Sequence, residues 1–213
     1  MHFKAAKRIL KYLKGTTNVG LWYPNESNIF LSDFSDSDYA GCKLDTKSTS
    51  GTCHLLGSSL ISWNSKNQAC VALSTTEAEY IATGHACAQR IWLKHQLMDY
   101  DVKLEKVPFY CDNTSAINLT KNPIQHSKTK HIEIRHHFIR DHIKKGDTEI
   151  MFVKIENQLA DIFTKPLAHD RFNKLRTELG ILDMKNICLY LLDLVILLYH
   201  VCVALKMTKI CII

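Results

Sequence analysis

The spacing of apolar residues changes along the chain, from short strand-like runs to a long helical stretch. The strand-like runs VGLWY, IFLSDFSD, GTCHLLG and SLISWNSK lie between residues 18 and 66 and are separated by Gly, Ser and Asn turns. From Ser74 to about Tyr100 the apolar residues recur at the spacing of one helix face. The change predicts the start of an antiparallel sheet, followed by a helix.

The rest of the chain alternates between helix and strand patterns. The strand VPFYCD is followed by a short helix from Asn113 to Leu119, a basic polar loop and a helix from about His131 to Lys144. TEIMFVK has the pattern of another strand, and NQLADIFTKPL has that of a helix that stops near Pro166. This order predicts an α/β chain in which helices pack on a mixed sheet.

The composition is that of an ordinary globular chain. Its 213 residues, 46% of them hydrophobic and 23% charged, suffice for one domain with a core and are too few for two large domains. The net charge of +6, with 11 histidines in addition, favours a polyanionic partner such as nucleic acid. The eight cysteines contain no CxxC pair, which predicts reduced thiols and an intracellular compartment.

Both ends of the chain differ from its middle. Residues 1–16 are basic and amphipathic up to Gly15, which predicts a connector helix and no signal peptide. Residues 187–205 are almost wholly apolar, but Asp193 and His200 raise the cost of placing them in a bilayer. We therefore expect one domain over residues 17–182 and an apolar tail outside the fold over residues 183–213, without a membrane partner.

A capping pattern distinguishes the two glutamates of LSTTEAEYIA. Ser74 followed by Glu77 is a capping box, in which Glu77 turns back to the first backbone donors of the helix. Glu77 then has a structural role. Glu79 is free to point elsewhere and is the better candidate for catalysis.

Strand alternation distinguishes the three aspartates of LSDFSDSDYAG. Asp33 shares a strand face with Leu31, whereas Asp36 lies on the opposite face and at the end of the run, where side chains gather into a site. Asp38 precedes YAG and is as well explained as a turn residue. Asp36 is therefore the candidate, and Asp33 and Asp38 are expected to be flanking residues.

Two later aspartates also follow or lie within apolar segments. Asp112 ends the strand VPFYC and begins a helix, so its ordinary role would be that of an N-cap. Asp161 lies four residues after Asn157 and on the same helical face, so it is either solvated or directed into a site. Each acid taken singly is more often structural than catalytic.

The candidates Asp36, Glu79, Asp112 and Asp161 gain meaning as a set. They lie at strand ends and on helices that a mixed sheet can bring together. Carboxylates in a cluster repel one another unless cations bind, and hard oxygen ligands select Mg²⁺ or Mn²⁺. Two such ions about 4 Å apart activate a water and stabilise the leaving oxygen of a phosphodiester.

Four segments of the chain resemble a known family. They are FSDSDYAGCKLDTKSTSGTCHLLGSSLISWNSKNQ, LSTTEAEYIA, YCDNTSAINLTKNPIQHSKTKHIEIRHHFIRD and ENQLADIFTKPL. From about residue 20 to 182 the chain resembles the ribonuclease H domain at the C-terminal end of copia-type retrotransposon polyproteins. The segment before it is similar to the link to the reverse transcriptase part. The resemblance implies a ribonuclease H-like mixed five-stranded sheet flanked by helices.

The resemblance also implies the roles of single residues. The family's SDxDxAG, AEY, CDN and ADxxTK motifs place its catalytic, metal-binding acids on Asp36, Glu79, Asp112 and Asp161. For Asp36 and Glu79 this agrees with the ranking by strand alternation and capping. The implied activity is cleavage of the RNA strand of an RNA/DNA hybrid with two Mg²⁺ (or Mn²⁺), leaving a 3′ hydroxyl. The implied partners are the hybrid and the reverse transcriptase part of the same polyprotein.

One departure from the pattern concerns histidine. Cellular ribonucleases H often carry a His shortly before the last Asp, which assists product release, whereas the stretch here is VKIENQLAD. A histidine-rich helix is more often surface, and no paired cysteines support a zinc site. We therefore assign no catalytic role to His126, His131, His136 and His137.

The residues expected to bind nucleic acid lie in two stretches, one after the first acid and one after the third. Lys, Ser and Thr side chains hold phosphates and a 2′-hydroxyl, which distinguishes RNA from DNA. The alternative is a solvated basic face. The predicted contact residues are Lys43, Lys47, Ser48, Thr49, Ser50, Lys121, Lys128, Lys130 and Arg135.

Three other functions stay open from the sequence. The first is a non-catalytic nucleic-acid-binding remnant of an integrated element. The second is a transposase or integrase, although those use the order Asp, Asp, Glu and here Glu79 comes second. The third is a membrane-anchored interaction protein, which depends on the apolar tail alone.

Overall fold

The computed structural model describes residues 2–25, 29–102, 104, 107–121, 137–146 and 148–184, which belong to two compact units. The smaller unit contains helix α1 (His2–Gly15) and an antiparallel pair of strands, β1 (Val19–Leu21) and β7 (Ile181–Asp183). Helix α1 ends at Gly15 as predicted, and none of its residues is buried. Its role as a connector stays a prediction.

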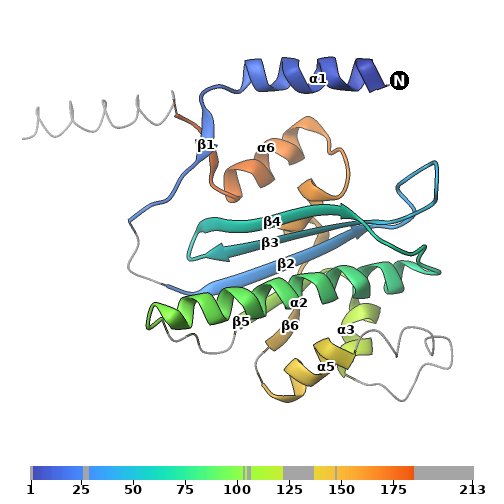
Figure 1. Cartoon of the computed structure of the whole chain (residues 1–213), viewed down its shortest axis with the longest axis vertical. Coiled ribbons are helices and arrows are strands. Elements are labelled where there is room, and N and C mark those ends of the chain that lie inside the picture. Colours follow the sequence, from blue (N-terminus) through green and yellow to red (C-terminus); the bar gives the residue numbers. More distant parts are fainter. Residues whose placement is uncertain are drawn as a thin grey trace, which may run out of the picture. The chain divides into compact units, whose positions relative to one another are not determined.

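The larger unit, residues 23–180, is built on a five-stranded mixed sheet (Figure 1). Its strands are β2 (Leu31–Asp38), β3 (Thr49–Leu56), β4 (Ser59–Asn67), β5 (Val107–Cys111) and β6 (Thr148–Phe152). Strand β3 is antiparallel to both β2 and β4, β5 is parallel to β2, and β6 is parallel to β5. The predicted mixed five-stranded sheet is confirmed, and β1 belongs to the other unit.

Helices α2 (Thr75–Asp99), α3 (Thr114–Lys121) and α5 (His137–Lys144) enclose the main apolar core with strands β5 and β6. The capping box that starts α2 is confirmed, because Ser74 Oγ accepts from the backbone N–H of Glu77 at 3.1 Å and Glu77 Oε2 accepts from that of Leu73 at 2.7 Å. The buried core residues are Tyr80, Ala86, Cys87, Phe109, Cys111, Ala116, Ile117, Leu119, Ile139 and Ile150.

The segment NQLADIFTKPL is not the α-helix that its pattern predicts. It contains the 3₁₀ segment η3 (Leu159–Phe163), which follows another, η2 (Ile155–Asn157), and precedes helix α6 (His169–Glu178). Gln158 separates η2 from η3, because its buried side chain caps η3 at Ala160 and its Nε2 donates to Ser35 O at 2.8 Å. This anchor to β2 interrupts the regular helix.

Strand β3 allows η3 to approach closely because it carries a glycine there. A Cβ added to Gly51 would lie 2.6 Å from Thr164 Cγ2 and 2.7 Å from Ala160 O. Gly51 is the register partner of Asp36 on β2. The close approach therefore places η3, and with it Asp161, beside the end of β2.

Other expectations concern membranes and thiols. None of the helices within the described parts is long and apolar enough to cross a membrane. The first two residues of the predicted tail, 183 and 184, are described, and Asp183 ends β7; residues 185–213 lie outside the described parts. Cys53, Cys87 and Cys111 are free and buried, in agreement with the reduced thiols expected from the sequence.

Asp33 belongs to a buried charged cluster on the α2 side of the sheet. Its Oδ1 lies 2.6 Å from His54 Nδ1 on β3, and its Oδ2 lies 3.5 Å from Arg90 Nε on α2. The exposed fractions of Asp33, His54 and Arg90 are 0%, 0% and 2%, so water screens none of these contacts. Asp33, expected to be a flanking residue, thus connects β2 to β3 and to α2.

Replacing Asp33 by Ala should destabilise the chain strongly. The change leaves the Arg90 cation buried without its acid, and breaking a buried ion pair in this way costs roughly 3–5 kcal/mol of the free energy of unfolding. Urea unfolding followed by circular dichroism measures this loss. The exposed Glu149 on β6 is the matched control, since Glu149→Ala should change stability by about 0.5 kcal/mol or less. A similar small change in Asp33→Ala would contradict the structural role.

Candidate metal centre

Asp36, Glu79, Asp112 and Asp161 come from four different elements of the larger unit. Asp36 lies on β2, Glu79 on α2, Asp112 directly after β5 and Asp161 in η3. Because Phe34 on β2 pairs with Tyr110 on the parallel strand β5, the two aspartates that lie two residues further occupy the same end of the sheet. Each of the four acids lies close enough to at least one other for their charges to repel. The structure therefore brings the predicted set together.

Glu79 has one oxygen held by the sheet and one without a partner. Its Oε1 accepts a hydrogen bond from the backbone N–H of Ser37, next to Asp36, at 3.0 Å. Its Oε2 is buried and has no hydrogen-bond partner among the described residues. A buried carboxylate oxygen without a donor is where a cation would compensate for the lost hydration.

Asp112 is not the N-cap that its position suggested. Asn113 caps α3 instead, since its Oδ1 accepts from the backbone N–H of Ala116 at 3.0 Å. One ligand atom each of Asp112, Glu79 and Cys111 lie within 4.8 Å of one another. Asp112 is thus left available for the acid cluster.

Cys111 is a poor metal ligand in spite of its place. Burial, together with the charge of Glu79, raises the pKa of its thiol to about 12. A protonated thiol does not bind hard cations, so the oxygen atoms of the acids are the donors that remain.

Cationic side chains already surround Asp161. Lys165 Nζ lies 2.5 Å from Asp161 Oδ1 and 3.9 Å from Asp36 Oδ2, and the Arg171 guanidinium pairs with Asp161 Oδ2. Burial lowers the pKa of Lys165, but its hydrogen bond to Asp161 and the acid charges raise it more, so the ammonium stays charged. These two cations offset part of the negative charge of the cluster.

Burial is the main reason that three acids of the cluster have raised pKa values, and repulsion between the acids adds to it. Burial, despite the hydrogen bond from Thr164, raises the pKa of Asp36 to about 6. Burial and then the charges of Asp36 and Asp112 raise that of Glu79 to about 9. Burial also raises the pKa of Asp112. Oxygen donors that resist ionisation in this way fit a site for divalent cations, whose charge would reverse the shifts.

The residues predicted to bind nucleic acid have different surroundings. Ser48 and Ser50 are buried, where Ser48 Oγ accepts from the backbone N–H of Ala40 and Ser50 Oγ accepts from Gln68 Nε2. Thr49 Oγ1 donates to Asn67 Oδ1 at 3.1 Å, and Lys47 lies 3.6 Å from Asp45. Lys43 is exposed in the loop after β2.

Lys121 is exposed at the last position of α3. Lys128, Lys130 and Arg135 lie outside the described residues, as do His126, His131 and His136; His137 begins α5. The contact of any of these residues with nucleic acid stays a prediction.

Two residues of the site carried no clear signal in the sequence. Thr164 Oγ1 donates to Asp36 Oδ2 at 2.5 Å. Burial raises the pKa of Asp112, and the hydrogen bond from the Gln158 side chain offsets part of that rise. Thr164 and Gln158 both lie within three residues of Asp161. Their proximity to an acid candidate was the one available indication.

The sequence is similar to transposon polyproteins along most of its length. It is 40% identical over 181 residues to the retrovirus-related Pol polyprotein from transposon RE1 of Arabidopsis thaliana, covering 84% of this chain and 12% of that protein. It is 38% identical over 179 residues to the one from transposon TNT 1-94 of Nicotiana tabacum, covering 84% and 13%. The chain thus spans about an eighth of the length of these relatives.

Comparisons with family models and with solved structures give weaker similarity than the polyprotein sequences do. No family model matches the chain. Comparison with LC11-RNase H1, isolated from compost, gives a TM-score of 0.48 at 13% identity over 68% of this chain and 96% of that one. Its complex with an RNA/DNA hybrid gives 0.47 at 12% identity over 63% and 93%. TM-scores of this size do not establish a shared fold by themselves.

The sequence relatives and the arrangement of the site lead to one family. The similarity to Pol polyproteins extends over 84% of the chain. The acids that the motif resemblance selected meet at one end of a mixed five-stranded sheet, in the strand order β4-β3-β2-β5-β6. The chain therefore corresponds in sequence to a segment of the retrovirus-related Pol polyproteins of transposons.

Proposed function

We propose that this domain is a metal-dependent endonuclease that cleaves the RNA strand of RNA/DNA hybrids, as the ribonuclease H part of a copia-type Pol polyprotein. The observation that carries the proposal is the convergence of Asp36, Glu79, Asp112 and Asp161 into a single cluster. Nothing in a purely structural role requires four acids, three of them buried, to lie in one cluster. A cation-assisted reaction at a phosphodiester does.

The same four acids would hold two Mg²⁺ (or Mn²⁺). When bound, such ions make a water nucleophilic near neutral pH and stabilise the leaving oxygen of a phosphodiester. The protein holds the donors in place: Thr164 orients the Asp36 carboxylate, and the backbone N–H of Ser37 orients that of Glu79. Lys165 brings a positive charge next to the position of a phosphate bound at these acids.

Substrate and partner follow from charge and from the polyprotein context. The net charge of +6 suits a nucleic acid, and Lys43, Lys47, Thr49 and Lys121 are the described candidates for phosphate contacts at or near the surface. Because the matched part makes up only about an eighth of these relatives, we propose that the reverse transcriptase part of the same polyprotein is the natural neighbour.

Asp36→Asn and Asp112→Asn should each abolish cleavage. Each change removes a carboxylate donor while keeping the side-chain shape, so a loss of about a hundredfold or more in rate is expected on a labelled RNA/DNA hybrid with Mg²⁺. Asp38→Asn, at the end of the same strand and outside the proposed ligand set, is the matched control and should retain activity.

Two outcomes would contradict the proposal. Unchanged cleavage in Asp36→Asn or Asp112→Asn would exclude that acid from the reaction. A wild-type chain that shifts the hybrid in a gel but cuts nothing with Mg²⁺ or Mn²⁺ would favour the alternative, a nucleic-acid-binding remnant.

Without divalent metal, the free energy of unfolding should fall as the pH rises. Folded Glu79 keeps its proton up to about pH 9, whereas in the unfolded chain it titrates near its ordinary value of 4.5. Between these values the folded chain binds more protons than the unfolded chain, so stability decreases with pH. Asp36 adds to this trend between 3.8 and about 6.

Urea unfolding in EDTA between about pH 5 and 9 measures this trend. Glu79→Gln should flatten it, whereas Glu149→Gln, at an exposed position on β6, should keep the wild-type slope. Added Mg²⁺ should also flatten the trend in the wild type. Equal slopes in the two variants would show that Glu79 is not protonated in the folded, metal-free chain.

A further inference from the structure

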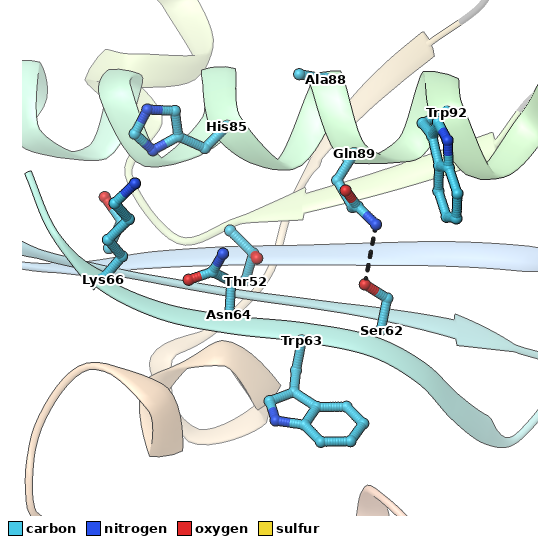
Figure 2. Close-up of a pocket in the computed structure, with 10 residues that line it drawn as sticks. Thr52, Ser62, Trp63, Asn64, Lys66, His85, Ala88, Gln89 and Trp92 are labelled. Carbon is cyan, nitrogen blue, oxygen red and sulfur yellow. Dashed lines mark hydrogen bonds between the residues drawn. The ribbon is translucent and has the colours of Figure 1, made fainter.

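A polar groove of about 520 Å³ lies between α2 and the strands β3 and β4 (Figure 2). We call it the α2–β4 groove. Its volume is within the range of pockets that hold small organic ligands. None of the four acids lines it, and its first residue on α2, His85, follows Glu79 by six residues. Its main lining side chains are Thr52, Asn64, Lys66, His85, Gln89 and Trp92.

The polarity of this groove is unusual for a sheet face that a helix covers. Ser62, Asn64 and Lys66 alternate along β4 toward α2, where apolar residues would normally pack. Gln89 Nε2 donates to Ser62 Oγ at 3.2 Å across the groove, as Figure 2 shows. The side chains of Asn64 and Lys66 form no hydrogen bond with any other residue in the described part of the chain. Their donors and acceptors are available to a ligand.

The two ends of the groove differ in chemistry. Lys66 and His85 lie at one end and Trp92 at the other, with Asn64 and Gln89 between them (Figure 2). Trp92 follows His85 by seven residues on α2, a rise of roughly 10 Å along the helix. The Trp92 side chain is 54% exposed, which leaves an aromatic face open to solvent.

The cationic end has no acid to balance it. No Asp or Glu is among the residues that line the groove, from α2, β3 or β4. Burial and then the charge of Lys66 lower the pKa of His85. An anion between Lys66 and His85 would relieve that repulsion.

We propose that the α2–β4 groove binds single-stranded nucleic acid, with a base stacked on Trp92 and a backbone phosphate between Lys66 and His85. Stacking on an exposed aromatic ring together with a cation for the phosphate is how proteins hold single strands of varied sequence. The amides of Asn64 and Gln89 can bond to base edges. A duplex keeps its bases stacked and cannot offer one to Trp92. The site is additional to the proposed cleavage of hybrids.

The test measures binding of a fluorescent ten-nucleotide DNA strand to the full chain by anisotropy, in EDTA. Trp92→Leu should weaken binding by at least about fivefold, the lower limit for loss of one stacked base. Trp63→Leu is the matched control, because Trp63 is similarly exposed at 51% and borders the groove on β4, but its ring points away from α2 (Figure 2). Trp92→Phe keeps an aromatic face and should retain most of the affinity.

A charge variant tests the other end of the groove. Lys66→Gln should weaken binding and reduce the dependence of log affinity on log salt by about 0.7, the contribution of one phosphate contact to a single strand. Lys144→Gln, exposed on α5, should change neither quantity.

Equal affinities in Trp92→Leu and Trp63→Leu would overturn the proposal, and so would tighter binding of a duplex of the same sequence than of the single strand. Circular dichroism shows whether each variant is folded. Since metal is absent and no acid of the cluster is changed, a chain that cleaves no hybrid would leave this proposal standing.

Discussion

Mutual repulsion among four acids, three of them buried, is the constraint that the larger unit has to satisfy. Asp36, Glu79 and Asp161 are each less than a tenth exposed, so water does little to separate their charges. Without other charges such a cluster would favour unfolding, since like charges in a medium of low dielectric repel strongly. Two features reduce this repulsion. Lys165 and Arg171 form ion pairs with Asp161, and Glu79, whose pKa rises to about 9, is protonated.

The strands and helices around the cluster hold its four acids in place. The parallel pairing of β5 with β2 brings Asp112 to the level of Asp36, and Gly51 lets η3 approach with Asp161. On the other face, the buried contacts of Asp33 with His54 and Arg90 fix α2, which carries Glu79. Sites that need carboxylates at close range are held by a rigid surrounding of this kind.

Local rules predicted which acids of β2 and α2 belong to the cluster, because each rule concerns one element. Strand alternation placed Asp33 and Asp36 on opposite faces. In the structure Asp33 pairs with Arg90 on α2, whereas Asp36 accepts a hydrogen bond from Thr164, which directly follows η3. The capping box left Glu79 free, as the hydrogen bonds of Glu77 confirm. The mixed sheet followed from the order of apolar patterns.

Contacts between distant segments were beyond such rules. No local pattern shows that Gln158 anchors to Ser35, which turns a predicted helix into 3₁₀ segments. No local pattern shows either that Asn113, and not Asp112, caps helix α3, or that Lys165 lies near Asp36. The α2–β4 groove depends on the register of β4 with β3 and on the path of α2, so it appears only in three dimensions.

The most direct measurement of the central claim is calorimetric titration of the chain with Mn²⁺ at about pH 7.5, in two buffers of different ionisation enthalpy. If the acids form a cation site in which Glu79 is protonated without metal, saturable binding should release about one proton, and the measured enthalpy should differ between the buffers. Glu79→Gln should remove that difference. Absence of saturable binding, or equal enthalpies in the two buffers for the wild type, would contradict the account.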